Sequence, residues 1–236
     1  MKNKVAFITG ASRGIGKAIA IALAKAECDV VLLARNESEL DEVAHECSNF
    51  KVTALPISCD LTNEDELVLA INKAYLKYPK IDFVINNAGV GTFEPVEEVS
   101  TKTFDWIMDT NVRANFILYR EFASRMKAEK AGHLLSIASD VSKRTFGNGS
   151  IYCASKYAQD AFSNAVRKEL RPFGIKVSVI YPGIVDTYFN NSKPGDDVFK
   201  NYLKPDDIAA SVLHVLSAPK HVVIDELVIH PLTQEY

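Results

Sequence analysis

The feature that most constrains the fold is a glycine-rich turn between an apolar run and a strongly helix-forming segment. Residues 4–9 form a short, continuous apolar run, as in a strand buried on both faces of a parallel sheet. Gly10, Gly14 and Gly16 follow, and residues 17–26 are mostly alanine, isoleucine and leucine. A helix that begins after such a turn offers unpaired N–H groups and a partial positive charge to a phosphate. The order of strand, turn and helix therefore predicts a phosphate-binding element.

The same alternation continues along the chain. Further strands are predicted over residues 29–34, 51–57, 82–86, 133–139, 175–181 and 222–229. Helices are predicted over residues 65–77, 104–126, 150–171 and 205–217. No linker or repeat divides the 236 residues. We therefore predict an α/β fold with a single Rossmann-fold domain over residues 1–236, a doubly wound seven-stranded parallel sheet with helices on both faces.

The composition of the chain bears on whether it binds nucleic acid, a membrane or a metal. Hydrophobic residues make up 47% of the chain and charged residues 24%, which is typical of a soluble protein with a large core. The formal net charge is −3 and the basic residues are scattered, so no nucleic-acid surface is expected. Only four apolar residues in a row follow the two N-terminal lysines, too few for a signal peptide or a membrane span, so we expect a cytoplasmic protein. The four cysteines show no metal-binding spacing and are expected to be free thiols.

The end of the second predicted strand indicates which dinucleotide is bound. Dinucleotide-binding folds usually place there an acidic residue that binds the ribose 2′-hydroxyl, whereas this chain has Arg35. Arg35, together with Arg13 from the glycine turn, can bind a 2′-phosphate, and each such hydrogen bond contributes about 1.5–3 kcal/mol. NADP(H) is therefore the expected cofactor; the alternative is that both arginines are merely solvated. Asp60 and Leu61, after the third strand, are expected near the adenine.

Three side chains between residues 139 and 156 can form a proton-transfer group. Tyr152 and Lys156 stand one helical turn apart and so share a face of the predicted helix. A Gly147-Asn148-Gly149 turn can fold the Ser139 hydroxyl back towards the phenol. The alternative is a tyrosine and a lysine on a solvated helix face, where this spacing is also common.

Taken together, several motifs resemble the short-chain dehydrogenases and reductases, in the right order and over nearly the whole chain. These are Thr9-Gly10-x-x-x-Gly14-x-Gly16, Asn86-Asn87-Ala88-Gly89, Asn111, Ser139, Tyr152-x-x-x-Lys156 and Pro182-Gly183. The resemblance implies that Ser139 holds the substrate carbonyl and that Tyr152 donates the proton in reduction. It also implies that Lys156 binds the nicotinamide ribose and lowers the pKa of Tyr152, and that Asn111 holds a water in a proton relay. The implied cofactor contacts are Gly10, Ser12, Arg13, Ile15, Gly16, Asn87, Ala88, Gly89, Tyr152, Lys156, Pro182, Gly183, Val185 and Thr187.

Simple electrostatics agrees with the role implied for the lysine. Lowering the pKa of a phenol by about three units requires about 4 kcal/mol. An ammonium group at roughly 4.5 Å, in an effective dielectric of about 20, supplies about 3.7 kcal/mol. We therefore expect Lys156 to supply most of the change in the pKa of Tyr152.

The residues after the sixth predicted strand concern the substrate. Residues 184–204 are predicted to form a short substrate loop, with Tyr188 and Phe189 as walls facing Arg144 and Phe146. The short loop and its aromatic residues are similar to those of bacterial sepiapterin-reductase-like proteins, which implies a sepiapterin-like pteridine or another small ketone. The alternatives are a 3-oxoacyl-(acyl-carrier-protein) reductase, a 3-hydroxy acid dehydrogenase and a non-catalytic NADP(H)-sensing protein.

Two further expectations concern partners. Phe173 stands where carrier-dependent ketoacyl reductases often have arginine, so a carrier-bound substrate ranks lower. The resemblance also implies a homodimer or homotetramer that packs through the helices predicted over residues 104–126 and 150–171.

Overall fold

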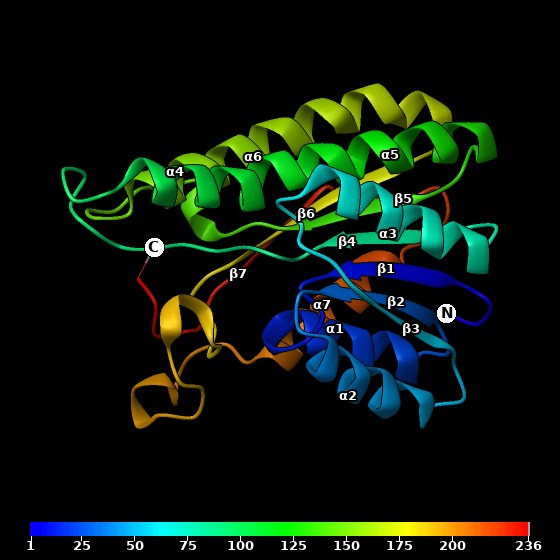
Figure 1. Ribbon diagram of the computed structural model, residues 1–236, viewed down its shortest axis with the longest axis horizontal. Helices are drawn as coiled ribbons and strands as arrows, with labels where there is room; N and C mark the ends of the chain where they lie inside the picture. Colours follow the sequence, from blue (N-terminus) through cyan, green and yellow to red (C-terminus); the bar gives the residue numbers. More distant parts are fainter. Residues whose placement is uncertain (236) are drawn as a thin grey trace.

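Seven parallel strands form one sheet in the order β3-β2-β1-β4-β5-β6-β7 in this computed structural model, which describes residues 1–235 (Figure 1). The strands are β1 (Val5–Thr9), β2 (Asp29–Ala34), β3 (Ala54–Ser58), β4 (Phe83–Asn86), β5 (His133–Ile137), β6 (Lys176–Pro182) and β7 (Glu226–Ile229). The predicted fold class is confirmed. The third strand starts later than predicted because Lys51, with φ at 62°, lies in the turn that ends the preceding helix.

Helices cover both faces of the sheet (Figure 1). On one face lie α1 (Gly14–Lys25), α2 (Glu37–Ser48) and α7 (Pro205–Leu216); on the other lie α3 (Glu64–Lys77), α4 (Thr101–Met108), α5 (Ala114–Glu129) and α6 (Ser150–Leu170). Successive strand residues enter opposite cores: Phe7 packs edge-on against Phe122 of α5, whereas Ile8 joins the core beneath α1. The continuous apolar runs of the sequence follow from this burial on both faces.

The long helix predicted over residues 104–126 is interrupted. It begins at Thr101, where the Ser100 hydroxyl accepts a hydrogen bond from the Thr103 N–H, and it ends at Glu129. Between α4 and α5 lies a π-helical segment, Asp109–Arg113, and Asn111 is at its centre. Such segments are rare and are frequent at functional sites, because they shift the helix register locally.

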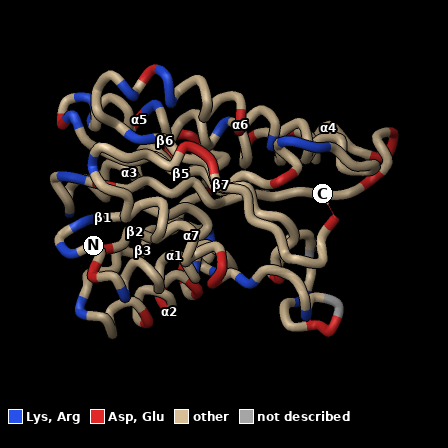
Figure 2. The backbone as a smooth tube through the Cα atoms, turned by 180° about the vertical axis from the view of Figure 1, so that it is seen from behind, with Lys and Arg blue, Asp and Glu red and all other residues tan. Residues whose placement is uncertain are grey.

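The charged residues are spread over the molecule. Lys and Arg occur on many elements and alternate with Asp and Glu instead of forming one band (Figure 2). All four cysteines are buried and free. Within residues 1–235 no helix is both long and apolar enough to cross a bilayer.

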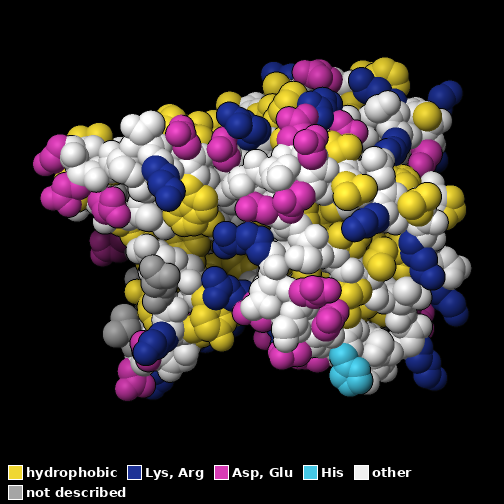
Figure 3. Space-filling view, in the orientation of Figure 1, with side chains coloured by type: hydrophobic (Ala, Val, Ile, Leu, Met, Phe, Trp, Pro, Cys, Tyr) yellow, Lys and Arg dark blue, Asp and Glu magenta, His cyan; other side chains and the backbone are white. Residues whose placement is uncertain are grey.

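The loops at the carboxyl ends of the strands gather at one edge of the sheet. The strand order reverses between β1 and β4, and open α/β sheets bind ligands in the crevice at such a point. Figure 3 shows a hollow at this edge, with hydrophobic side chains inside it and basic side chains beside it. The loop after β6 and the segment around α4 project on either side (Figure 1).

Candidate active site

Two adjoining cavities occupy this edge of the sheet. The first, which we call the glycine-turn cavity, has a volume of about 470 Å³ and is lined by the residues after β1, β2, β3 and β4. The second, the tyrosine cavity, has a volume of about 460 Å³ and is lined by Ser139, Tyr152, Lys156 and the loop after β6. The residues that line both cavities are Ile15, Asn87, Gly89, Thr187 and Phe189.

The glycine turn leaves the start of α1 without a side-chain cap. Gly10 and Gly14 adopt left-handed conformations with φ of 65° and 55°, which residues with a side chain rarely adopt. No side chain caps α1 and its first turn contains no acidic residue, whereas Asn36 and Asn63 cap α2 and α3. The N–H groups at this end are therefore suited to an anion that supplies the missing acceptors.

The position of Gly16 differs from the expected one, in which this glycine faces a phosphate. It is buried and lines neither cavity; a Cβ at this position would lie 2.1 Å from the Gly10 carbonyl oxygen. Its lack of a side chain serves the close packing of α1 on the turn.

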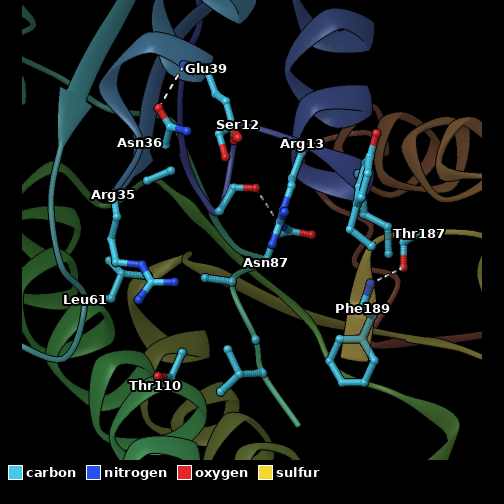
Figure 4. Close-up of a pocket in the computed structure, with 18 of the residues that line it drawn as sticks. Ser12, Arg13, Arg35, Asn36, Glu39, Leu61, Asn87, Thr110, Thr187 and Phe189 are labelled. Atoms are coloured by element: carbon cyan, nitrogen blue, oxygen red, sulfur yellow. Dashed lines mark hydrogen bonds between the residues drawn. The ribbon is translucent and has the colours of Figure 1, made fainter. Parts of the chain in front are cut away.

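The residues after β4 are fastened to the glycine turn. The Thr9 hydroxyl accepts hydrogen bonds from the backbone N–H groups of Asn87 and Ala88, both at 3.1 Å. The Asn87 amide donates to the Thr9 and Gly10 carbonyl oxygens at 2.9 and 3.3 Å, so it holds the two segments together (Figure 4). Gly10, Asn87, Ala88 and Gly89 thus form one wall of the glycine-turn cavity.

Both predicted arginines line this cavity and both are exposed. The Arg13 guanidinium lies 5.2 Å from the centre of the Tyr188 ring, and Arg35 and Leu61 line the same cavity (Figure 4). Ser12, Asp60 and Leu61 line the same cavity, as expected. Glu39, from the first turn of α2, also lines it. Sequence reasoning missed this residue because it considered only the residues at the end of the strand, and Glu39 comes later, in the helix.

Tyr152 is buried in the wall of the tyrosine cavity. It lies in the first turn of α6, and its ring packs against those of Phe93 and Phe189, with centroids 5.8 and 5.3 Å away. Burial raises the pKa of the phenol, while a side-chain hydrogen bond with Ser139 opposes that rise. Ser139 and Tyr152 are therefore brought together as the sequence predicts.

Lys156 lies one turn further along α6 and is also buried. Its Nζ donates hydrogen bonds to Gln159 Oε1 at 3.1 Å and to the Ile137 carbonyl oxygen at 3.4 Å. Burial lowers the pKa of this ammonium to about 8. The expected lowering of the pKa of Tyr152 by Lys156 is not found: the groups that act on the phenol are Ser139, Asp140 and Cys153, and desolvation has the largest effect.

Asn111 lines neither cavity. Its Oδ1 accepts from the Val90 N–H at 2.9 Å, and its Nδ2 donates to the Val90 carbonyl oxygen at 2.8 Å and to Ser155 Oγ at 2.9 Å. The amide thus ties the loop after β4 to α6. The relay water implied by the resemblance remains a prediction.

The loop after β6 contributes to both cavities. Pro182, Gly183 and Val185 line the tyrosine cavity and Thr187 lines both. Phe189 lies where predicted, but Tyr188 lines only the glycine-turn cavity, since its ring stacks on Arg13. Tyr188 therefore does not share the tyrosine cavity with Phe189, and its contact with the substrate stays a prediction.

The opposite wall of the tyrosine cavity is aromatic. Arg144 and Phe146 line it as predicted, and Phe146 packs edge-on against Phe93 with centroids 5.2 Å apart. Asp140 also lines it, within the stretch 140–148 that is expected to face the substrate, whereas sequence reasoning missed Phe93, Phe199 and Tyr202. The position of Phe93 shortly after the Asn87-Ala88-Gly89 turn could have indicated it, because that turn already pointed to the site.

A doubly wound sheet that places an uncapped glycine turn beside a serine, a tyrosine and a lysine defines the Rossmann-fold dehydrogenases and reductases. More specifically, the chain belongs to the short chain dehydrogenase family, whose profile matches residues 4–197. An uncharacterized oxidoreductase of Staphylococcus aureus is 34% identical over 232 residues, which are 98% of this chain and 99% of that protein.

Solved structures give the same family. An alcohol dehydrogenase from the archaeon Thermococcus sibiricus, complexed with 5-hydroxy-NADP, has a TM-score of 0.94 and 35% identity, covering 99% of this chain and 98% of that chain. A metagenomic short-chain oxidoreductase in complex with NADP has a TM-score of 0.87 and 31% identity, covering 99% of both chains. The chain is thus an oxidoreductase of the short-chain type.

Proposed function

We propose that this protein is an NADP(H)-dependent carbonyl reductase that acts on small, uncharged ketones with aromatic or other apolar rings. The observation that supports it most is that Ser139, Tyr152 and Lys156 line one cavity that adjoins the glycine-turn cavity. A dinucleotide whose phosphates lie at the start of α1 can reach from one cavity to the other.

The glycine-turn cavity fits NADP(H). The uncapped start of α1 suits the pyrophosphate, and Arg13 and Arg35 suit a 2′-phosphate. Asp60 and Leu61 are proposed to hold the adenine, and Asn87, Ala88, Gly89, Val185 and Thr187 the nicotinamide half. The NADP-bound relatives of known structure support this preference. When bound, the reduced cofactor supplies the hydride.

The protein's own groups supply the proton. Since burial raises the pKa of Tyr152, the phenol stays protonated at neutral pH and can donate its proton to the oxygen of the reduced carbonyl. Ser139, beside it, donates a hydrogen bond to the same oxygen, where negative charge develops. Lys156 holds the nicotinamide ribose, and Asn111 fixes the loop at Val90 against α6.

The walls of the tyrosine cavity favour an uncharged substrate. Phe93, Phe146 and Phe189 provide aromatic faces, and the Arg144 guanidinium is already paired with Asp140. A carboxylate group on the substrate could therefore not pair with Arg144 unless Arg144 left Asp140, which argues against a 3-hydroxy acid. Sepiapterin-like pteridines and cyclic diketones are the first candidates. A 3-oxoacyl carrier substrate stays second, supported by the 28% identity to a 3-ketoacyl-(acyl-carrier-protein) reductase from Brucella melitensis with a TM-score of 0.89.

The test is a substrate panel followed by the loss of NADPH absorbance. It contains aromatic ketones, cyclic diketones, a pteridine ketone, 3-oxoacyl thioesters and 3-oxo acids, each with NADPH and with NADH. The proposal expects the highest kcat/KM for uncharged cyclic or aromatic ketones with NADPH. Turnover only of the 3-oxo acids, or equal use of NADH, would overturn it, and NADPH binding without any turnover would favour a sensing protein.

Domain organisation, assembly and location belong to the same proposal. We propose that residues 1–236 act as one NADP(H)-binding domain with a substrate loop over residues 184–204. We propose a cytoplasmic homodimer or homotetramer that packs through α5 and α6. Light scattering coupled to size exclusion would give a single dimer or tetramer mass, and a monomer at micromolar concentration would contradict it.

A further inference from the structure

A buried carboxylate lies directly behind the serine of the active site. Asp140 follows Ser139, and its side chain is only 5% exposed. Its Oδ1 accepts a hydrogen bond from Ser139 Oγ at 3.1 Å. Its Oδ2 accepts from Arg144 Nε at 2.9 Å and from Gln234 Nε2 at 2.8 Å, and His230 Nε2 lies 3.5 Å away. The Ser139 hydroxyl is thus one end of a polar network that reaches the C-terminal tail.

Gln234 joins this network to the other side of the tyrosine cavity. Its Oε1 accepts a hydrogen bond from the Ile184 N–H at 2.8 Å, at the start of the loop after β6. A Cβ at Gly183 would lie 2.2 Å from the same Oε1, so the glycine makes room for the tail. In Figure 1 the red C-terminal tail passes beside this loop. One side-chain amide therefore contacts both the carboxylate behind Ser139 and the backbone that opens the substrate loop.

The donors on Asp140 determine how it acts on Ser139. A serine hydroxyl has one proton, which it can give either to Asp140 or to a substrate oxygen. Arg144 and Gln234 both donate to Oδ2, so they share the charge of Asp140 and weaken it as an acceptor for Ser139. With fewer donors, Asp140 would hold the hydroxyl more tightly and turn it away from the substrate.

The same carboxylate acts on the phenol. The charge of Asp140 raises the pKa of Tyr152, in addition to the larger effect of burial. The other charged or titratable groups that face the phenol or Asp140 are Lys156 and Cys153 on α6, Arg144 after β5, and His230 on the tail. Loss of a donor to Asp140 would leave more negative charge beside both Ser139 and Tyr152.

We propose that Asp140 is a positioning residue that orients the Ser139 hydroxyl, and that Gln234 of the C-terminal tail sets how strongly it does so. This inference rests on the proposed function, in which Ser139 donates a hydrogen bond to the substrate oxygen. In this inference Gln234, on the C-terminal tail, belongs to the active site.

Two substitutions at Gln234 separate this role from simple fastening of the loop. Gln234→Glu keeps an oxygen for the Ile184 N–H but replaces the donor to Asp140 with a second carboxyl group. Gln234→Ala removes both contacts. Leu232→Ala is the matched control, because Leu232 lies in the same tail and is fully exposed. Each variant is assayed for kcat, for the KM of the ketone and of NADPH, and for NADPH binding by fluorescence, between pH 5.5 and 8.5.

At pH 8 we expect kcat to fall about tenfold or more in both Gln234 variants, with NADPH affinity within about twofold of wild type. In Gln234→Glu the ratio of kcat to the wild-type value should recover as the pH falls, because the two carboxyl groups then share a proton that restores a donor to Asp140. A role in loop fastening alone would spare Gln234→Glu and would raise only the KM of the ketone in Gln234→Ala.

Wild-type kcat in Gln234→Glu, or a deficit in that variant that does not change with pH, would overturn the inference. If Gln234→Ala does not fold, the pair Asp140→Asn and Asp140→Asn/Gln234→Glu gives a second readout: without the Asp140 carboxylate, Gln234→Glu should no longer lower kcat, and an undiminished loss would count against the inference. An inactive wild-type enzyme would refute the proposed function instead. An active wild type with unaffected Gln234 variants refutes the inference alone.

Discussion

The Nζ of Lys156 lies 5.9 Å from the centre of the Tyr152 ring, and both side chains are buried. Burial acts on them in opposite directions, since it raises the pKa of the phenol and lowers the pKa of the ammonium to about 8. The tyrosine therefore keeps its proton at neutral pH, while the lysine is close to losing its own. This relationship favours a tyrosine that donates a proton, as carbonyl reduction requires.

The lowered pKa of Lys156 predicts a pH-dependent stability. Its value of about 8 in the folded protein lies below the ordinary value of 10.5, so the unfolded chain binds more protons between these values and folding becomes more favourable as the pH rises. Relative to Lys156→Met, the wild type should gain about 2 kcal/mol in free energy of unfolding between pH 7 and pH 10. Urea unfolding of both proteins measures this. A difference that does not change with pH would show that Lys156 titrates normally in the fold.

Gly91 controls the position of the phenol ring. A Cβ there would lie 2.7 Å from Tyr152 Cδ2 and 2.9 Å from Phe189 Cζ, so Gly91→Ala should displace the Tyr152 ring. We expect kcat to fall about 10- to 100-fold with NADPH affinity nearly unchanged. Gly147→Ala is the control, because a Cβ at Gly147 has nothing within 4 Å. Equal activity of the two variants would mean that the ring tolerates the methyl group.

Substitutions of two side chains in the glycine-turn cavity, Arg35 and Glu39, should change the affinity for NADPH in opposite directions. Arg35→Ala should weaken NADPH binding about tenfold and leave NADH binding within about twofold, because only NADPH carries the 2′-phosphate. Glu39→Gln should strengthen NADPH binding a few-fold, since it removes a negative charge from the same cavity. Lys77→Ala, an exposed cation outside both cavities, serves as control. Equal losses for both cofactors in Arg35→Ala would place the arginine away from the 2′-phosphate.

The sequence predicts the sheet and the parts of the site that lie close to strand ends. Continuous apolar runs, glycines with left-handed backbone and the one-turn spacing of Tyr152 and Lys156 are local features, so periodicity and turn chemistry suffice to find them. The Asp140 network joins residues 94 apart in the chain, and no local pattern predicts that contact.

Three other features were beyond sequence reasoning for physical reasons. Asn111 lies at the centre of the π-helical segment, and the hydrogen bonds from its amide to Val90 and Ser155 form only once the elements pack. The high pKa of the phenol follows from its burial, whereas the pairwise estimate with Lys156 leaves out the cost of removing the charged phenolate from water. The stacking of Arg13 on Tyr188 likewise comes from the path of the loop after β6.

The most direct test of the central claim is the turnover of Tyr152→Phe, which removes only the phenolic oxygen. Steady-state reduction of the best uncharged ketone by NADPH is measured for this variant and the wild type, together with the NADPH dissociation constant of each. We predict that kcat falls about 10²- to 10⁴-fold while the dissociation constant stays within about twofold. A variant that reduces the ketone at the wild-type rate would contradict the assignment of Tyr152 as the proton donor.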